Sequence, residues 1–213
     1  MQIEIEPQVL EWTREQFSSM VDTVKLKIFT QPEHCVFCNA LMELAAKLAE
    51  ISPKLQIESC SCDADHPVSK EFGVDKHPAI IIQGKEPYKV RWFGIPIGFE
   101  FSMLIQDIVT ASIGETGLDE EVKTILRSID RPVQLQVFTI PMCPKCPNMV
   151  RTAHDFAFFN RNITADVIDA LEFRELAAKW HVLETPRTVI NEKIEFAGVI
   201  GEKELAEMLL AQT

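Results

Sequence analysis

Residues 135–146 read LQVFTIPMCPKC, an apolar run that leads directly into two cysteines separated by two residues. Residues 26–38 read LKIFTQPEHCVFC and repeat this pattern, with one extra residue in the loop. A CxxC pair alone could be half of a zinc site, a structural disulfide or a redox dithiol. The remainder of the repeat therefore decides which kind of site these cysteines form and which fold carries them.

The repeat extends well beyond the cysteines. Residues 71–85 (EFGVDKHPAIIIQGK) align with residues 179–193 (KWHVLETPRTVINEK), which places a proline opposite a proline. Each proline lies 43 residues after the first cysteine of its CxxC pair, and the two copies are 108 positions apart. Chance similarity does not keep a dithiol, a proline and an apolar strand in register, so the chain contains two copies of one unit.

Each copy predicts the same order of elements. The glycines of SIGETGLD (112–119) predict a boundary there, which gives an N-terminal unit of residues 1–115 and a C-terminal unit of residues 116–213. Apolar periodicity predicts, in the first unit, helices over 7–22, 38–50, 66–73 and 99–111 and strands over 24–30, 54–62, 79–83 and 88–93. In the second unit it predicts helices over 118–129, 146–159, 171–181 and 201–211 and strands over 133–139, 162–168, 187–191 and 193–197.

A strand that ends in CxxC and continues as a helix is suited to thiol chemistry. The thiolate is the form of cysteine that attacks a disulfide, and a free cysteine is mostly protonated near neutral pH. Unpaired N–H groups and the positive dipole end at a helix N-terminus favour the thiolate. The second cysteine, one turn on, can attack the first sulfur and release a bound substrate. We therefore expect Cys35 and Cys143 to be nucleophiles and Cys38 and Cys146 to be resolving thiols.

The repeated prolines belong to the same expectation. Pro78 follows His77 and Pro186 follows Thr185, each immediately before a predicted strand. An X–Pro bond in such a position is a candidate for the cis form. We expect each loop to face its dithiol and to present backbone groups to an extended substrate, so that all four residues contribute to substrate binding.

CVFC and CPKC, each followed by a proline and the strand AIIIQ or RTVIN, resemble the motifs of the thioredoxin/glutaredoxin superfamily. The tandem arrangement is similar to the two-unit protein disulfide oxidoreductases of thermophilic prokaryotes. This resemblance implies an α/β fold of two thioredoxin-like units, each a four-stranded mixed sheet flanked by helices. It also implies disulfide reduction, oxidation or isomerisation, with electrons supplied by a thioredoxin-reductase-type flavoenzyme. Phe29 and Val137 stand where many thioredoxins carry a buried acid.

Two further cysteines, Cys60 and Cys62, lie in the first copy alone. The repeat places them opposite Ile168 and Ala170, which indicates core positions where cysteine acts as a small hydrophobe. They could instead form an accessory disulfide or thiol relay. A third interpretation is a zinc site in which Cys60 and Cys62 join the two thiols of the first CxxC.

Charge and hydropathy exclude some classes of partner. The formal net charge of −11 disfavours nucleic acid and anionic membranes as partners. The N-terminal residues lack the pattern of a signal peptide, and the apolar runs are shorter than the ~18–20 residues that span a bilayer. We therefore expect a cytoplasmic protein, where paired cysteines more often indicate catalysis or metal binding than disulfide scaffolds.

The resulting functional prediction is an enzyme, a protein disulfide oxidoreductase. Its two dithiols would exchange disulfides with cysteine-containing protein substrates, and that chemistry requires neither an organic cofactor nor a metal. One alternative is an electron-relay module that reduces a dedicated partner such as a peroxidase. The other is a zinc-stabilised binding protein that uses Cys35, Cys38, Cys60 and Cys62.

Overall fold

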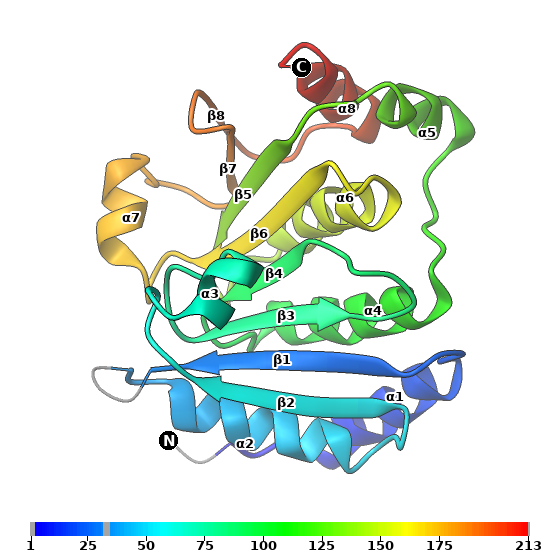
Figure 1. Cartoon of the computed structure of the whole chain (residues 1–213), viewed down its shortest axis with the longest axis vertical. Helices are drawn as coiled ribbons and strands as arrows, with labels where there is room; N and C mark the ends of the chain where they lie inside the picture. The colour runs from blue at the N-terminus through cyan, green and yellow to red at the C-terminus, as the bar shows by residue number, and fades with distance from the viewer. Residues whose placement is uncertain (1–2, 32–34, 213) are drawn as a thin grey trace. The chain divides into compact units, whose positions relative to one another are not determined.

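The chain forms two compact α/β units, which a computed structural model describes for residues 3–31 and 35–212 (Figure 1). The first unit comprises Met1–Pro87, Trp92–Ile95 and Leu104–Gly114. The second comprises Tyr88–Arg91, Pro96–Met103 and Glu115–Thr213. Two short segments that precede the predicted boundary thus group with the second unit. The boundary between residues 115 and 116 remains a prediction.

The first copy of the repeat contains four helices and four strands among the described residues. They are α1 (Pro7–Ser18), β1 (Val24–Thr30), α2 (Cys38–Ala49), β2 (Leu55–Ser61), α3 (Pro67–Phe72), β3 (Ala79–Gln83), β4 (Val90–Phe93) and α4 (Phe99–Ile113). The strand order is β2-β1-β3-β4, with β1 parallel to β2 and antiparallel to β3. Helix α2 packs on β1 and β2 (Figure 1).

The second copy repeats this arrangement. Its elements are α5 (Glu120–Arg127), β5 (Val133–Thr139), α6 (Cys146–Phe159), β6 (Ile163–Asp169), α7 (Arg174–Lys179), β7 (Arg187–Ile190), β8 (Ile194–Ala197) and α8 (Glu202–Leu210). Here the order is β6-β5-β7-β8, with β5 parallel to β6 and antiparallel to β7. Helix α6 packs on β5 and β6 (Figure 1).

Strands β1 and β5, which lie inside the sheet, are apolar because helices cover them. Leu26 and Ile28 on β1 and Leu135 and Val137 on β5 are fully buried, as expected for strands that lie within a sheet and are packed against helices. In both units the strand that precedes the cysteine loop is therefore held firmly in the core. The loop that follows is the part that reaches the end of the sheet.

Helix α1 is shorter than its apolar pattern predicts. It ends at Ser18, where the hydroxyls of Ser18 and Ser19 each donate a 2.6 Å hydrogen bond to a carbonyl one turn earlier. Such side-chain bonds to the backbone compete with continuation of a helix. Met20 is still buried, but Val21 is 63% exposed and does not belong to the apolar stripe. Among the residues described, we find no helix whose length and apolarity would suffice to cross a bilayer.

Candidate active sites: two dithiols

The second dithiol lies where β5 passes into α6. Cys143 and Cys146 form a disulfide, and both side chains are buried. Helix α6 begins at Cys146, so Cys143 lies in the turn before the helix, where its N–H donates to the carbonyl of Ile140 at 3.0 Å. The sequence predicts the first cysteine at the helix N-terminus. The structure places it three residues before the first helical residue, Cys146, whose N–H is unpaired within the helix.

Two backbone groups surround the sulfur of Cys143. The N–H of Cys146 donates to Cys143 Sγ at 3.1 Å, and the carbonyl oxygen of Thr185 lies 3.5 Å from the same sulfur. The Thr185–Pro186 peptide bond is cis. An N–H directed at the sulfur stabilises a thiolate more than a thiol. The structure thus brings Cys143, Cys146 and Thr185 together, three residues that the repeat singles out.

The first dithiol is built by the same local sequence. Cys35 and Cys38 form a disulfide, and α2 begins at Cys38. Cys38 is buried, whereas Cys35 is half-buried and thus more accessible than its counterpart Cys143. The His77–Pro78 peptide bond is cis. Burial lowers the pKa of His77 below its ordinary value, although the charges of Asp63 and Asp75 act in the opposite direction. Part of the first loop, residues 32–34, lies outside the described residues.

Exposed apolar side chains flank both dithiols. Met142, which immediately precedes Cys143, is 75% exposed, and Leu183, two residues before Thr185, is 95% exposed. In the first unit Val36, between the two cysteines, is 84% exposed. Large exposed apolar side chains around a reactive centre favour contact with another protein, because burying them there is favourable.

Glu100 is a buried carboxyl at the base of the Cys143 loop that the sequence analysis missed. It accepts a hydrogen bond from the hydroxyl of Thr139, the last residue of β5. The adjacent Phe99 N–H donates to the carbonyl of Pro141 at 2.9 Å. Gly98 permits this approach, because a Cβ there would lie 2.4 Å from the Pro141 carbonyl oxygen and its φ is +61°.

Burial raises the pKa of Glu100 to about 8, and the charges of Asp169 and Glu172 add to the rise, while the Thr139 hydrogen bond opposes it. Burial likewise raises the pKa of Asp169, which pairs in register with Thr139 at the end of β6. A carboxyl whose pKa lies near neutral pH is therefore hydrogen-bonded to Thr139, four residues before Cys143. The only sequence signal was a glutamate within the apolar run FEFSMLI (99–105).

Cys60 and Cys62 are joined in a third disulfide. Cys62 is buried, but Cys60 is half-buried, so the interpretation of both as simple core residues holds for one of them. The predicted zinc arrangement would bring these two sulfurs together with those of Cys35 and Cys38. Within the described part of the chain, the group whose ligand atoms converge is instead Cys60, Cys62 and His66.

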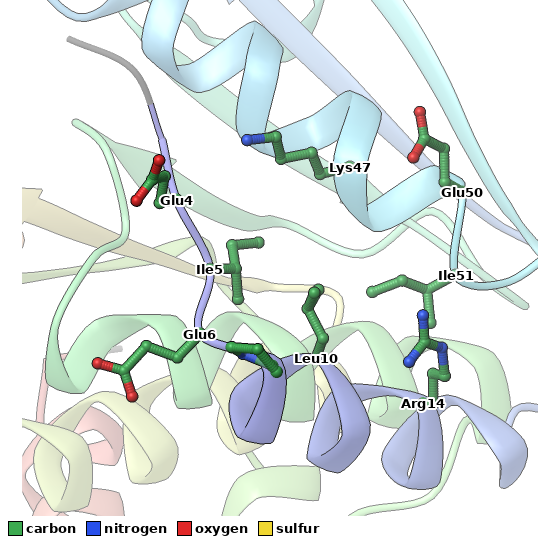
Figure 2. Close-up of a pocket in the computed structure, with 9 residues that line it drawn as sticks. Glu4, Ile5, Glu6, Leu10, Arg14, Lys47, Glu50 and Ile51 are labelled. Carbon is green, nitrogen blue, oxygen red and sulfur yellow. The ribbon is translucent and has the colours of Figure 1, made fainter.

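A separate hollow of about 580 Å³ lies in the first unit, away from the cysteines (Figure 2). Figure 2 shows the apolar side chains of Ile5 in the N-terminal segment and Leu10 in α1, with the charged side chains of Lys47 on α2 and Arg14 on α1 around the same space. Glu4, Glu6 and Glu50 surround the same hollow. Its lining is a mixture of opposite charges over a small apolar patch, without a thiol or imidazole.

The fold and the paired dithiols define the class of protein. The family model described as a thioredoxin domain matches residues 133–210, which lie within the second unit. Over 99% of this chain and 94% of the other, the structure superimposes on a protein disulfide oxidoreductase from Aeropyrum pernix K1 with a TM-score of 0.91 and 27% sequence identity. The resemblance to a tandem thioredoxin-like protein of the thermophilic type and the predicted fold of two four-stranded α/β units are thereby confirmed.

A second group of relatives carries a different name. The chain is 25% identical, over 151 residues, to the alkyl hydroperoxide reductase component AhpF of Staphylococcus aureus, covering 71% of this chain but 27% of that protein. The chain thus spans about a quarter of the length of these curated relatives. AhpF of Enterococcus faecalis superimposes with a TM-score of 0.88 at 19% identity over 96% of this chain and 99% of the other, which shows the shared fold. Both CxxC pairs and the thioredoxin fold match those of a protein disulfide oxidoreductase.

Proposed function

We propose that the chain catalyses dithiol–disulfide exchange on cysteine-containing proteins through Cys35/Cys38 and Cys143/Cys146. The observation that carries the proposal is the surroundings of Cys143 Sγ, with the Cys146 N–H at 3.1 Å and the Thr185 carbonyl at 3.5 Å. These groups belong to the two motifs that recur at fixed separation in the first unit. Both sites have a CxxC disulfide whose second cysteine begins a helix and a cis X–Pro bond 43 residues after the first cysteine, which supports the same role for both.

In the reductive direction, the reaction at the second site begins with the Cys143 thiolate. It attacks one sulfur of a substrate disulfide, forms a mixed disulfide and releases the other substrate sulfur as a thiolate. The Cys146 thiolate then attacks the Cys143 sulfur and releases the second substrate thiolate. The two substrate thiolates take up two protons, and the Cys143–Cys146 disulfide holds the two oxidising equivalents. Run in reverse, the same steps oxidise a substrate dithiol.

The loops around each dithiol support extended protein segments as substrates. Residues His77, Pro78, Thr185 and Pro186 are proposed to bind the substrate backbone, because the Thr185 carbonyl already faces the reactive sulfur. Met142, which precedes Cys143, and Leu183, two residues before Thr185, offer exposed apolar side chains for contact with the substrate. In this role the backbone groups align the substrate while the exposed side chains bury apolar area.

Sustained reduction needs a source of two electrons and two protons per turnover. We propose a thioredoxin-reductase-type flavoenzyme as that donor and the cytoplasm as the working compartment, since exchange-active cysteine pairs are typical of reducing compartments. A purified flavoprotein reductase should reduce the oxidised chain stoichiometrically with NADPH. No transfer of electrons from several such reductases would argue against this donor class.

The proposal is tested by insulin-disulfide reduction with Cys35→Ser, Cys143→Ser and the double variant. We expect each single variant to keep the activity of its intact site and the double variant to fall by at least about a hundredfold, because the nucleophile is absent from both sites. Ser18→Ala, which removes one side-chain oxygen at an exposed position, serves as the matched control. Full activity in the double variant would overturn the proposal.

A second function, an electron relay to a peroxidase, is favoured by the relatives named as alkyl hydroperoxide reductase components. Their likeness to this chain is partial, so we rank the relay second. It predicts that the reduced chain transfers electrons to a peroxidase of the cysteine type much faster than to insulin. Comparable rates for both acceptors would favour general disulfide exchange.

A further inference from the structure

Three potential metal ligands converge at one end of the first unit, outside the proposed dithiol sites. They are the sulfurs of Cys60 and Cys62 and an imidazole nitrogen of His66, and all three atoms lie within 4.8 Å of one another. Cys60 lies in β2, Cys62 follows that strand, and His66 is the residue before α3. The cluster ranges from the buried Cys62 to the exposed His66, so an ion could reach it from solvent.

The backbone holds the three side chains in place. The N–H of Cys62 donates to the carbonyl of Thr30 at 2.9 Å, which extends the β1–β2 pairing beyond the end of β2. The turn that follows is closed by a 3.0 Å hydrogen bond from the N–H of His66 to the carbonyl of Asp63. Three residues of the cluster are thus fixed by a strand and a tight turn rather than by a loose loop.

The imidazole of His66 is oriented by the backbone. Its Nδ1 accepts a hydrogen bond from the N–H of Val68 at 3.2 Å, which holds the ring beside the first turn of α3. A neutral imidazole nitrogen is a common zinc ligand. Beside it, the hydroxyl of Ser69 lies 3.4 Å from Cys62 Sγ, where it can donate to a thiolate held by a metal.

The second unit shows that the fold does not require this cluster. At the positions 108 residues further on, it has Ile168, Ala170 and Arg174 in place of Cys60, Cys62 and His66. Ile168 is buried on β6, and the Arg174 guanidinium donates to the carbonyl of Leu171 at 3.0 Å. The second unit therefore connects its corresponding strand and helix without sulfur or imidazole, and the three ligands are a property of the first unit alone.

We propose that reduced Cys60 and Cys62, together with His66, bind one Zn²⁺, and that oxidation of the two cysteines to the disulfide releases it. Two thiolates and an imidazole are ligands that zinc prefers, whereas Mg²⁺ and Ca²⁺ prefer oxygen. Three protein ligands leave one tetrahedral position for water. The structure shows the oxidised state, in which the two sulfurs are bonded to each other.

The switch balances in atoms and electrons. An external dithiol reduces the Cys60–Cys62 disulfide with two electrons and two protons and is itself oxidised to a disulfide. Zn²⁺ then displaces the two thiol protons as it binds, so binding strengthens as pH rises. Oxidation by a disulfide runs the sequence backwards and frees the metal. Zinc occupancy of this site would then depend on the ratio of thiols to disulfides around the protein. The proposed exchange activity of the chain changes that same ratio.

The test must separate this site from the CxxC pairs, because any reduced dithiol offers thiolate ligands to zinc. We would replace Cys35, Cys38, Cys143 and Cys146 by serine, reduce the protein with dithiothreitol, remove the reductant without air and titrate Zn²⁺ against a chromophoric chelator. We expect one Zn²⁺ per reduced chain, none in the oxidised protein and release of bound Zn²⁺ on adding oxidised dithiothreitol. Co²⁺ in place of Zn²⁺ should give a thiolate charge-transfer band.

The matched control carries Cys60→Ile, Cys62→Ala and His66→Arg in the same background, which copies the residues of the second unit. It should fold, as judged by circular dichroism, and bind no Zn²⁺, while His66→Arg alone should weaken binding by at least about tenfold. Reduced protein that binds no more Zn²⁺ than this control would overturn the proposal and leave a disulfide alone at this site. Binding that is unaffected by His66→Arg would also contradict it. Neither readout depends on insulin reduction, so failure of this proposal and failure of the proposed exchange activity are distinguishable.

Discussion

Glu100 shows how one buried side chain can make stability depend on pH. Its pKa is about 8 in the folded chain against an ordinary value of 4.5. Between these values the folded chain holds a proton that the unfolded chain has released, so the free energy of unfolding falls as pH rises through this window. Each unit of raised pKa corresponds to about 1.4 kcal/mol.

We therefore predict that Glu100→Gln flattens the decline in stability between about pH 4.5 and 8. Urea unfolding at several pH values measures this, with the cysteines kept oxidised because free thiols titrate in the same range. Asp169 is present in both proteins and largely cancels in the comparison. Glu175→Gln, on an exposed position of α7, is the control and should keep the wild-type slope. Equal slopes for wild type and Glu100→Gln would show that Glu100 is ionised in the folded chain.

The exposed side chains of Met142 and Leu183 are expected to contribute to the binding of protein substrates. Replacing both by serine removes apolar contact area beside Cys143 but leaves the reacting sulfur and the Thr185 carbonyl in place. We expect KM for insulin to rise by about fivefold, equivalent to roughly 1 kcal/mol of interface contact, while the rate with a small disulfide such as oxidised dithiothreitol stays the same. Equal losses with both substrates would mean that these side chains shape the site rather than bind protein.

At the scale of elements, the segment Tyr88–Arg91 is held against β6 by a buried ion pair. Arg91 donates to both carboxylate oxygens of Asp166, at 2.5 and 2.8 Å, and Gln134 of β5 donates to the same carboxylate at 2.8 Å. The N–H of Ala165 also donates to the carbonyl of Lys89 at 3.0 Å. These bonds explain why the segment groups with the second unit.

Arg91→Met should destabilise the second unit by about 3–5 kcal/mol, because it leaves the buried Asp166 carboxylate without its cation. The measurement is urea unfolding followed by circular dichroism at neutral pH. Arg14→Met is the matched control, since Arg14 pairs with Glu11 on an exposed face and should change stability by less than about 1 kcal/mol. Similar effects of the two substitutions would mean that the Arg91 pair is as weak as a surface pair.

The helices and strands were predictable because the same sequence pattern occurs in both copies of the repeat. The strand before each CxxC, the helix after it and the proline 43 residues on recur in register, and the structure places them accordingly. Glu100 and the Arg91–Asp166 pair were not predictable, since periodicity tells which face of an element is buried but not which distant side chain it meets. For the same reason the grouping of residues 88–91 and 96–103 with the second unit could not be read from the sequence.

At the scale of the whole molecule, the grouping of residues 88–91 and 96–103 with the second unit affects whether residues 116–213 are stable as a separate fragment. A fragment of residues 116–213 keeps β5 to β8 but loses both Arg91 and Glu100. We predict that its free energy of unfolding is lower by about 3–5 kcal/mol than that of the second unit in the full chain, because Asp166 is left as an unpaired buried charge. Adding Asp166→Leu to the fragment should recover part of this loss. A urea midpoint equal to that of the full chain would contradict the prediction.

The two copies also imply that the chain carries two sites with different exposure, since Cys35 is half-buried and Cys143 is buried. Different accessibility of otherwise similar dithiols favours a division of work between substrates rather than simple duplication. The relative rates of insulin reduction by Cys35→Ser and Cys143→Ser would measure that division.

The central claim is that Cys143 is the attacking sulfur of a dithiol exchange site and Cys146 its resolving partner, and trapping tests it most directly. The variant Cys146→Ser, combined with Cys35→Ser and Cys38→Ser to silence the first site, is incubated with a protein disulfide substrate and quenched with acid. We expect a mixed disulfide between substrate and Cys143, identified by peptide mass mapping and absent when Cys143 is also changed to serine. An adduct carried by Cys60 or Cys62, or one that persists without Cys143, would contradict it.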